Sequence, residues 1–268
     1  MNATSDNQPT SGITRTKAVT AVALLILVAG LGLGAYALFA SLGVWFGMWD
    51  FRTGFNMLRT VNASADWVAW ISLALTIGVF VAARRIAPAS AQKLATFAAI
   101  GTVAATLAYV VPETYRAPEG TPPIHDITTD TDNPPQFVAV APLRANAPNS
   151  VIYGDQANWD ASKMAAAQRE AYPEIVPQVF IESKEEVFNR VLTAVDTLGW
   201  ELVDQNLADG RVEATDTTFW FRFKDDVIVL ITETPNGTVL NARSKSRVGG
   251  SDIGKNAARL RALFAEIK

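Results

Sequence analysis

The sequence predicts an α+β protein in which three N-terminal transmembrane helices precede a soluble domain with an antiparallel sheet of about five strands and helices on one face. Charge divides the chain: residues 1–111 hold seven Lys or Arg and three acids, net +4, whereas residues 112–268 hold 16 basic and 23 acidic side chains, net −7. Long apolar stretches fall in the first part, and short alternating stretches separated by turn residues fall in the second.

The membrane domain is predicted over residues 18–111, after a disordered polar tail over residues 1–17. A span must cross a hydrocarbon core of about 30 Å. The three stretches that are apolar and long enough are residues 18–42, 67–83 and 94–111. The protein is therefore expected to be a multi-pass protein of the lipid bilayer.

Two parts of this membrane domain allow another interpretation. A cleaved signal peptide is the alternative for the first span, although the apolar region of such peptides is normally about 7–15 residues. Residues 43–66 are rich in Trp and Phe, which predicts a short interfacial or re-entrant helix. A lipid- or quinone-binding groove is the functional alternative for the same stretch.

Basic residues near the ends of the spans predict the orientation, because the cytoplasmic side carries the excess of Lys and Arg. Five lie on the N-terminal side and three on the opposite side: Arg15, Lys17, Arg84, Arg85 and Lys93 against Arg52, Arg59 and Arg116. This excess favours a cytoplasmic N-terminus. Three crossings of the inner (cytoplasmic) membrane then place the C-terminal domain outside the cytoplasm, in the periplasm of a Gram-negative cell.

Residues 112–150 form a proline-rich extended segment that contains eight of the 13 prolines. Proline fixes one backbone angle and lacks an N–H donor, so the segment cannot be a regular helix or a central strand. Its residues 124–137 (IHDITTDTDNPPQF) are too specific for a spacer, and we expect them to lie along the folded domain.

The soluble α+β domain is predicted over residues 151–268. Helices are expected at 159–171, at 183–198 with a Ser183–Glu186 capping box, and after a cap at Ser251 or Asp252. Strands are expected over residues 178–182, 200–205, 211–215, 219–224, 227–233 and 239–247.

Strand alternation predicts that one sheet face is polar and locally basic. Residues 211–261 carry nine basic and six acidic side chains. The ligand-binding candidates on this face and in the turn after it are Arg211, Arg222, Arg243, Ser244, Lys245, Ser246, Arg247, Ser251, Lys255 and Asn256. The alternatives are a solvated sheet face, or a face covered by the acidic residues 124–137.

No catalytic constellation is found in the sequence, and no cofactor is expected. His125 is the only histidine, so a metal site of His125, Asp126 and Asp130 is a weak candidate that lacks the paired spacing of good zinc signatures. Residues 249–256 (GGSDIGKN) nearly match a phosphate-binding loop, but Asn256 stands where a hydroxyl must bind magnesium. An anion held by amides at this helix start is the weaker alternative.

Six stretches together resemble the DUF1499 family, a domain of unknown function: IHDITTDTDNPPQF, YPEI, GW, RVEATDTT, FKDDV and RSKSRVGGSDIGKNAARLR. Residues 112–268 are the DUF1499-like part, and GMWDFRTGFNMLR resembles members with three N-terminal helices, so the likeness covers nearly the whole chain after residue 17. It implies a membrane-anchored bacterial protein without assigned catalytic residues. Any functional surface of the family would fall on His125, Asp126, Thr128, Asp130, Asp216, Asp225, Asp226, Arg243, Ser244, Ser246, Arg247, Ser251, Asp252, Asn256 and Arg259.

The leading functional hypothesis is a non-enzymatic domain that binds an anionic lipid or a membrane protein partner at the membrane surface. An acidic domain has no general attraction to nucleic acid, so no such partner is expected. The second hypothesis is a hydrolase or metal-dependent enzyme that uses His125 with Asp126 or Asp130. The third is a structural subunit of a membrane complex.

Overall fold

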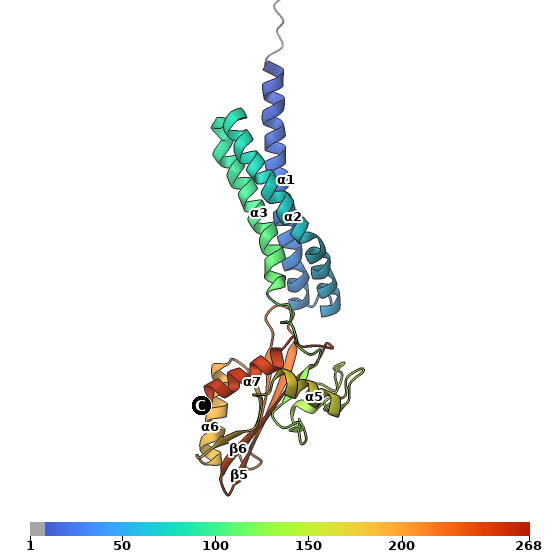
Figure 1. Ribbon diagram of the computed structural model, residues 1–268, viewed down its shortest axis with the longest axis vertical. Coiled ribbons are helices and arrows are strands. Elements are labelled where there is room, and N and C mark those ends of the chain that lie inside the picture. Colours follow the sequence, from blue (N-terminus) through green and yellow to red (C-terminus); the bar gives the residue numbers. More distant parts are fainter. Residues whose placement is uncertain (1–8) are drawn as a thin grey trace, which may run out of the picture. The chain divides into compact units, whose positions relative to one another are not determined.

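The computed structural model describes residues 9–268, and the chain divides into two compact units, Met1–Arg116 and Ala117–Lys268 (Figure 1). The first unit contains α1 (Pro9–Trp45), α2 (Phe51–Ile86), the short 3₁₀ helix η1 (Pro88–Ser90) and α3 (Ala91–Glu113). Three candidate spans in the described residues are long and apolar enough to cross a membrane: Gly12–Trp45, Phe51–Ile86 and Pro88–Glu113.

The helices of this unit are longer than the sequence predicted. Residues 9–17 are the first turns of α1 rather than part of a disordered tail, because proline is compatible with a helix start and no second proline occurs before the helix ends at Trp45. The rest of that predicted tail, residues 1–8, lies outside the described residues. Residues 51–66 form no separate interfacial helix. They are the first half of α2, whose start is capped by the Asp50 side chain accepting from Thr53 N at 2.9 Å.

Close approach of helix backbones holds the first unit together. A Cβ on Gly30 of α1 would lie 1.8 Å from the Gly101 carbonyl oxygen of α3, so only glycine fits at this crossing. The hydroxyls of Thr76 and Thr102 lie 2.8 Å apart and link α2 to α3. Small residues therefore decide how these helices pack.

The second unit is an α+β domain. Its elements are β1 (Asp126–Thr128), α4 (Val140–Leu143), α5 (Ala161–Ala171), β2 (Gln178–Phe180), α6 (Lys184–Thr197), β3 (Glu201–Asn206), β4 (Arg211–Thr217), β5 (Lys224–Thr234), β6 (Gly237–Ser246) and α7 (Lys255–Glu266). The strand order is β1-β6-β5-β4-β3, β2 also pairs with β6, and every pair is antiparallel. The predicted antiparallel sheet is confirmed, with six strands in the described residues.

The hydrophobic core lies between one face of the sheet and the helices (Figure 1). Val212, Val229 and Leu240 contribute from the strands, and Val191 and Leu260 from α6 and α7. The predicted Ser183–Glu186 capping box begins α6. At α7 the N-cap is instead Gly254 in the left-handed conformation (φ 82°), and the Asp252 side chain accepts from Gly254 N and Asn256 N, both at 2.8 Å.

Two local predictions differ from the structure. A strand is predicted over residues 219–224, but residues 218–223 form the turn that joins β4 to β5, and only Lys224 belongs to a strand. Thr218 N donates to the Phe223 carbonyl at 2.8 Å and closes this turn. Residues 126–128, predicted only to lie along the domain, form the strand β1 against β6.

Candidate functional site

The second sheet face carries a buried ionic network that we name the segment-side cluster: Asp126, Arg144, Asp226, Arg243, Lys245 and Arg247. The strand register builds it, because Asp126, Lys245, Asp226 and Thr215 are neighbours in one row across β1, β6, β5 and β4. Alternation along each strand sends these side chains away from the helices. Residues 130–152 cover them.

Asp126 is the first centre of the cluster. Its carboxylate accepts from Arg243 Nε and Nη2, both at 2.9 Å, and from Lys245 Nζ at 2.7 Å, and all three side chains are fully buried. Burial opposes ionisation of Asp126, but Arg243 and Lys245 outweigh it and hold its pKa below the ordinary value. Burial also lowers the pKa of Lys245, against the attraction of Asp126.

Asp226 is the second centre. Its carboxylate accepts from Arg144 Nη1 at 3.0 Å, from Arg247 at 2.7 and 2.9 Å, and from the Thr215 hydroxyl at 2.7 Å. Arg144 and Asp226 are buried, whereas 14% of the Arg247 side chain remains exposed. Removing one partner from such a buried pair leaves an uncompensated charge, which costs about 3–5 kcal/mol.

The cluster holds four cations and two carboxylates, and backbone carbonyls accept from most of the remaining donors, although the buried Arg144 Nε has no partner among the described residues. Arg243 donates to the carbonyls of Pro135 at 3.0 Å and Val151 at 2.8 Å, and Lys245 donates to Ile152 at 2.8 Å. Arg144 donates to the Asn149 carbonyl at 3.0 Å. A proline-rich segment is short of N–H donors, so the buried Arg and Lys side chains supply the hydrogen bonds that its carbonyls need.

Arg243 has the most restrictive surroundings. Its guanidinium lies 5.1 Å from the Phe137 ring centre and 5.6 Å from that of Tyr153, in addition to its two-point contact with Asp126. A lysine could reproduce the charge but not the planar pairing. Arg243 therefore joins the covering segment to the sheet.

Glu213 anchors the same segment further along. Its carboxylate accepts from Val138 N at 2.8 Å, Ala139 N at 3.1 Å and Val140 N at 2.8 Å, where α4 begins. Ile228, Phe137 and Val140 pack together beside it. The covering segment is thus held by ionic, backbone and apolar contacts together.

A helix-side cluster occupies the opposite face of the sheet, at the start of α7. The Asn256 side chain joins the Ser244 hydroxyl (2.7 Å), the Ser246 hydroxyl (3.0 Å) and the His125 carbonyl (2.9 Å). Arg259 bridges Asp225 at 2.7 Å and Asp216 at 2.8 Å. These contacts fix α7 against β5 and β6. Burial raises the pKa of Asp252, which holds the turn before α7.

His125 does not form the arrangement that a hydrolase or a metal site needs. It is 1% exposed, and its Nδ1 has no hydrogen-bond partner among the described residues. Burial and the charge of Lys245 lower its pKa to about 4. Asp126 is held by Arg243 and Lys245, and Asp130 accepts from the backbone of its own turn. The described residues contain no group of three or more His, Cys, Asp or Glu placed to hold a metal ion.

The predicted binding surface is largely interior. The structure agrees with the alternative in which a segment from earlier in the chain covers the polar sheet face. The covering segment is residues 130–152, which is longer than the predicted residues 124–137. Arg243, Ser244, Lys245, Ser246 and Asn256 are buried, and Arg211 and Arg247 are half-buried. Arg222, Ser251 and Lys255 are exposed. Alternation correctly assigned the side of the sheet to Arg243 and Lys245, but not their burial.

Three residues that sequence reasoning missed complete the arrangement: Arg144, Glu213 and Gln168. Gln168 of α5 accepts from Thr128 N at 3.0 Å and donates to the Thr128 carbonyl at 2.6 Å, so its amide takes the place of a neighbouring strand at the β1 edge. Arg144 is the one Lys or Arg between Arg116 and Lys163, and this isolation in an acidic stretch was the available signal.

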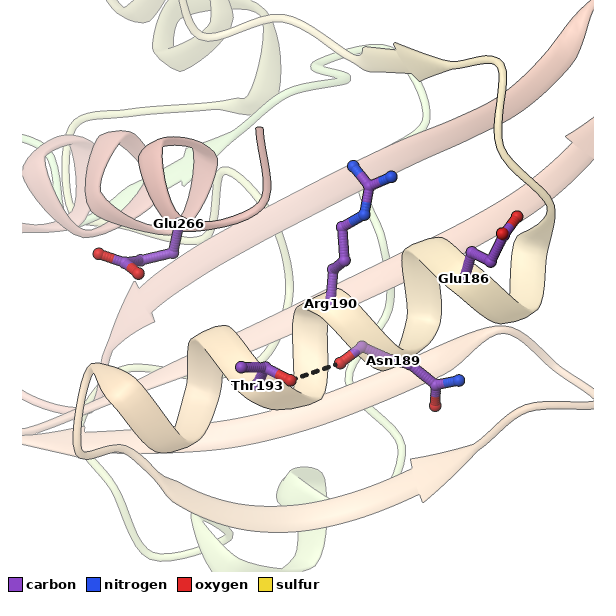
Figure 2. A pocket seen from close by; sticks show the side chains of 5 residues that line it. All are labelled: Glu186, Asn189, Arg190, Thr193 and Glu266. Carbon is purple, nitrogen blue, oxygen red and sulfur yellow. Dashed lines mark hydrogen bonds between the residues drawn. The ribbon is translucent and has the colours of Figure 1, made fainter.

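A shallow hollow of ≈ 390 Å³ lies elsewhere, between α6 and the end of α7, lined by Glu186, Asn189, Arg190, Thr193 and Glu266 (Figure 2). Glu186 caps α6, Arg190 pairs with Glu182 and donates to the Ile267 carbonyl, and the Thr193 hydroxyl donates to the Asn189 carbonyl at 3.0 Å. Most of its polar groups thus stabilise the helices that carry them.

Both clusters coincide with the motifs quoted from the sequence. The profile of the DUF1499 family, described as a protein of unknown function, matches residues 126–267. The match begins at Asp126 and contains every charged side chain of both clusters. A comparison with curated proteins gives no match. Because the matched residues make up more than half of the chain, this protein belongs to the DUF1499 family.

Proposed function

We propose that this protein is a membrane-tethered binding module, whose DUF1499 domain binds an anionic lipid headgroup or a partner protein at the membrane surface. The observation that carries this proposal is that the polar and charged candidates fall into a buried set and an exposed set. The buried ones are engaged in holding the covering segment and α7, while the exposed candidates Arg222, Ser251 and Lys255 gather at one end of the sheet.

The register identifies that end. Asp126, where the chain enters β1, pairs with Lys245 near the end of β6, and Asp226 near the start of β5 pairs with the same residue. The turn that carries Arg222 and the turn before Lys255 therefore lie at the sheet end where the chain enters from the membrane unit. We name this end the tether end.

The length of the chain limits how far the tether end can lie from the end of α3. Residues 114–125 are the 12 residues between the end of α3 and the start of β1. Even fully extended they span at most about 40 Å. Basic side chains at such a position are suited to phosphate-bearing headgroups or to an acidic surface of a partner.

The binding experiment is native mass spectrometry of the full-length protein, released from a gentle detergent with added phosphatidylglycerol. The double variant Arg222→Glu/Lys255→Glu is expected to lose most of the bound lipid or partner. The control Lys184→Glu/Lys268→Glu makes the same charge change away from the tether end and should bind like the wild type. Equal retention by both variants would contradict the proposal, and so would bare wild-type protein.

The side of the membrane is part of the proposal, and the basic-residue excess supports an extracytoplasmic domain in the periplasm. The chain has no cysteine, so Ile181→Cys creates a single thiol at a side chain that is 96% exposed. A membrane-impermeant maleimide should label this thiol once the outer membrane is permeabilised and the inner membrane is intact. Labelling only after inner-membrane lysis would place the domain in the cytoplasm instead.

A further inference from the structure

The turn between β4 and β5, residues 218–223 with the sequence TFWFRF, is unlike the other hairpin turns of the domain. It holds four aromatic residues and Arg222, is followed by Lys224, and contains no acid. The other two hairpin turns, at residues 207–210 (LADG) and 235–236 (PN), have no aromatic side chain. We name residues 218–223 the aromatic turn.

Hydrogen bonds and ring contacts hold the aromatic turn in a defined shape. Phe223 N donates to the Thr218 hydroxyl at 2.9 Å, in addition to the backbone bond in the reverse direction. The Phe221 and Phe223 rings stack with centres 5.7 Å apart, and the Phe219 and Trp220 rings meet edge to face at 5.2 Å. Arg222 adopts φ 55°, a left-handed conformation that favours glycine. The turn is therefore a built feature rather than a loose connection.

The shape divides the turn into a buried foot and an exposed tip. Phe221 is 9% exposed, whereas Phe219 is 65% exposed. Arg222 and Lys224 are exposed beside the tip. Lys224 Nζ lies 3.8 Å from the exposed Glu201 carboxylate, in a loose surface pair, whereas the turn itself contains no acid. An aromatic tip beside cations matches the headgroup layer of a bilayer, which accepts aromatic rings and attracts positive charge when its lipids are anionic.

The aromatic turn also lies at the tether end, because Asp126, Lys245, Asp226 and Thr215 share one row and the turn follows β4 directly beyond Thr215. The sheet thus presents this turn on the same side as the segment that leads from α3. Both position and composition point to the same occupant.

We propose that the aromatic turn inserts into the headgroup layer of the bilayer, with Phe219 among the upper acyl chains and with Arg222 and Lys224 at the lipid phosphates. The insertion holds the tether end of the domain against the membrane. This inference rests on the proposed function, because the proposed function also places the domain at the membrane surface. It goes further in naming the bilayer as the contact of the aromatic turn.

The experiment uses the full-length protein in nanodiscs of mixed phosphatidylglycerol and phosphatidylcholine. In the cysteine-free chain, Phe219→Cys places one nitroxide at the tip, and Ile181→Cys places the matched control at another exposed apolar side chain. Collisions with oxygen, which concentrates in lipid, are compared with collisions with a water-soluble nickel chelate. The tip label should meet oxygen several-fold more than nickel, and the control label should show the opposite preference.

Two results would overturn the insertion. A tip label as accessible to nickel as the control places the aromatic turn in water, and a tip label shielded from both reagents places it against protein. In phosphatidylcholine alone, Arg222→Glu should show the same oxygen preference as the wild type, because no anionic headgroup is present. In the mixed nanodiscs, Arg222→Glu should lose at least half of this preference. An unchanged preference in the mixed nanodiscs removes the role of Arg222. Wild-type protein that carries no lipid in the mass-spectrometry experiment but keeps the oxygen preference in nanodiscs would refute headgroup binding and leave insertion standing.

Discussion

The buried histidine makes the stability of the soluble unit depend on pH in a predictable way. His125 is the only imidazole of the chain, and burial lowers its pKa to about 4 from the ordinary 6.5. The folded domain therefore keeps the ring neutral where the unfolded chain already binds a proton. Stability is unaffected above pH 6.5 and is lost as the pH falls from 6.5 towards 4.

The magnitude follows from the gap between the two pKa values. Each pKa unit corresponds to about 1.4 kcal/mol, so the full loss is about 3 kcal/mol. At pH 5 about 2 kcal/mol of this is already lost. For a domain of this size, that lowers the melting temperature by roughly 4–8 °C. A typical domain has only about 5–15 kcal/mol of stability, so the effect is large enough to measure.

The assay is urea unfolding of residues 117–268 at pH 7.5 and pH 5, beside the variant His125→Gln. The variant keeps the carbonyl of residue 125, which accepts from Ser246 N at 3.0 Å and from Asn256 at 2.9 Å, but cannot bind the proton. Asp252, whose pKa is raised by burial, contributes the opposite sign, and its contribution cancels between the two proteins.

The wild type should lose about 2 kcal/mol more than His125→Gln between pH 7.5 and pH 5. Equal losses in the two proteins would refute the reasoning. An NMR titration of the single imidazole gives an independent check, since a midpoint near 6.5 in the folded domain would show that the ring is not buried as described.

Two further predictions concern packing and charge. Arg243→Ala should lower the free energy of unfolding by about 3–5 kcal/mol, because it leaves buried charge without a partner. The control Arg169→Ala removes an exposed ion pair and should lower it by less than about 1 kcal/mol. Equal losses in urea titrations of the two variants would argue against a structural role for the segment-side cluster. Gly30→Ala should overpack the crossing with Gly101, destabilise the helix packing by about 1–3 kcal/mol and lower the melting temperature in detergent. Gly32→Ala should leave the melting temperature unchanged, because a Cβ there meets nothing within 4 Å. Identical melting temperatures of the two variants would contradict the close approach of α1 and α3.

Local patterns were sufficient for much of the fold. Three apolar stretches predicted three helices, and the Ser183–Glu186 box predicted the start of α6, because span length and capping depend on residues close in sequence. The same reasoning failed over residues 219–223. Alternating aromatic residues are typical of a strand, and only the pairing of Thr217 with Lys224 across the hairpin shows that a turn must lie between them.

The sequence by itself determined the family resemblance, the three helices that are apolar and long enough to span a membrane, and the side of the sheet on which Arg243 and Lys245 lie. Apolar length and strand alternation are both local properties. Whether that side faces water or protein was decided only by the tertiary structure. The covering carbonyls of Pro135, Val151 and Ile152 lie about 90 to 110 residues before these side chains. Proline-rich backbone has carbonyls in excess of N–H donors, and it reaches its partners only when the sheet has assembled.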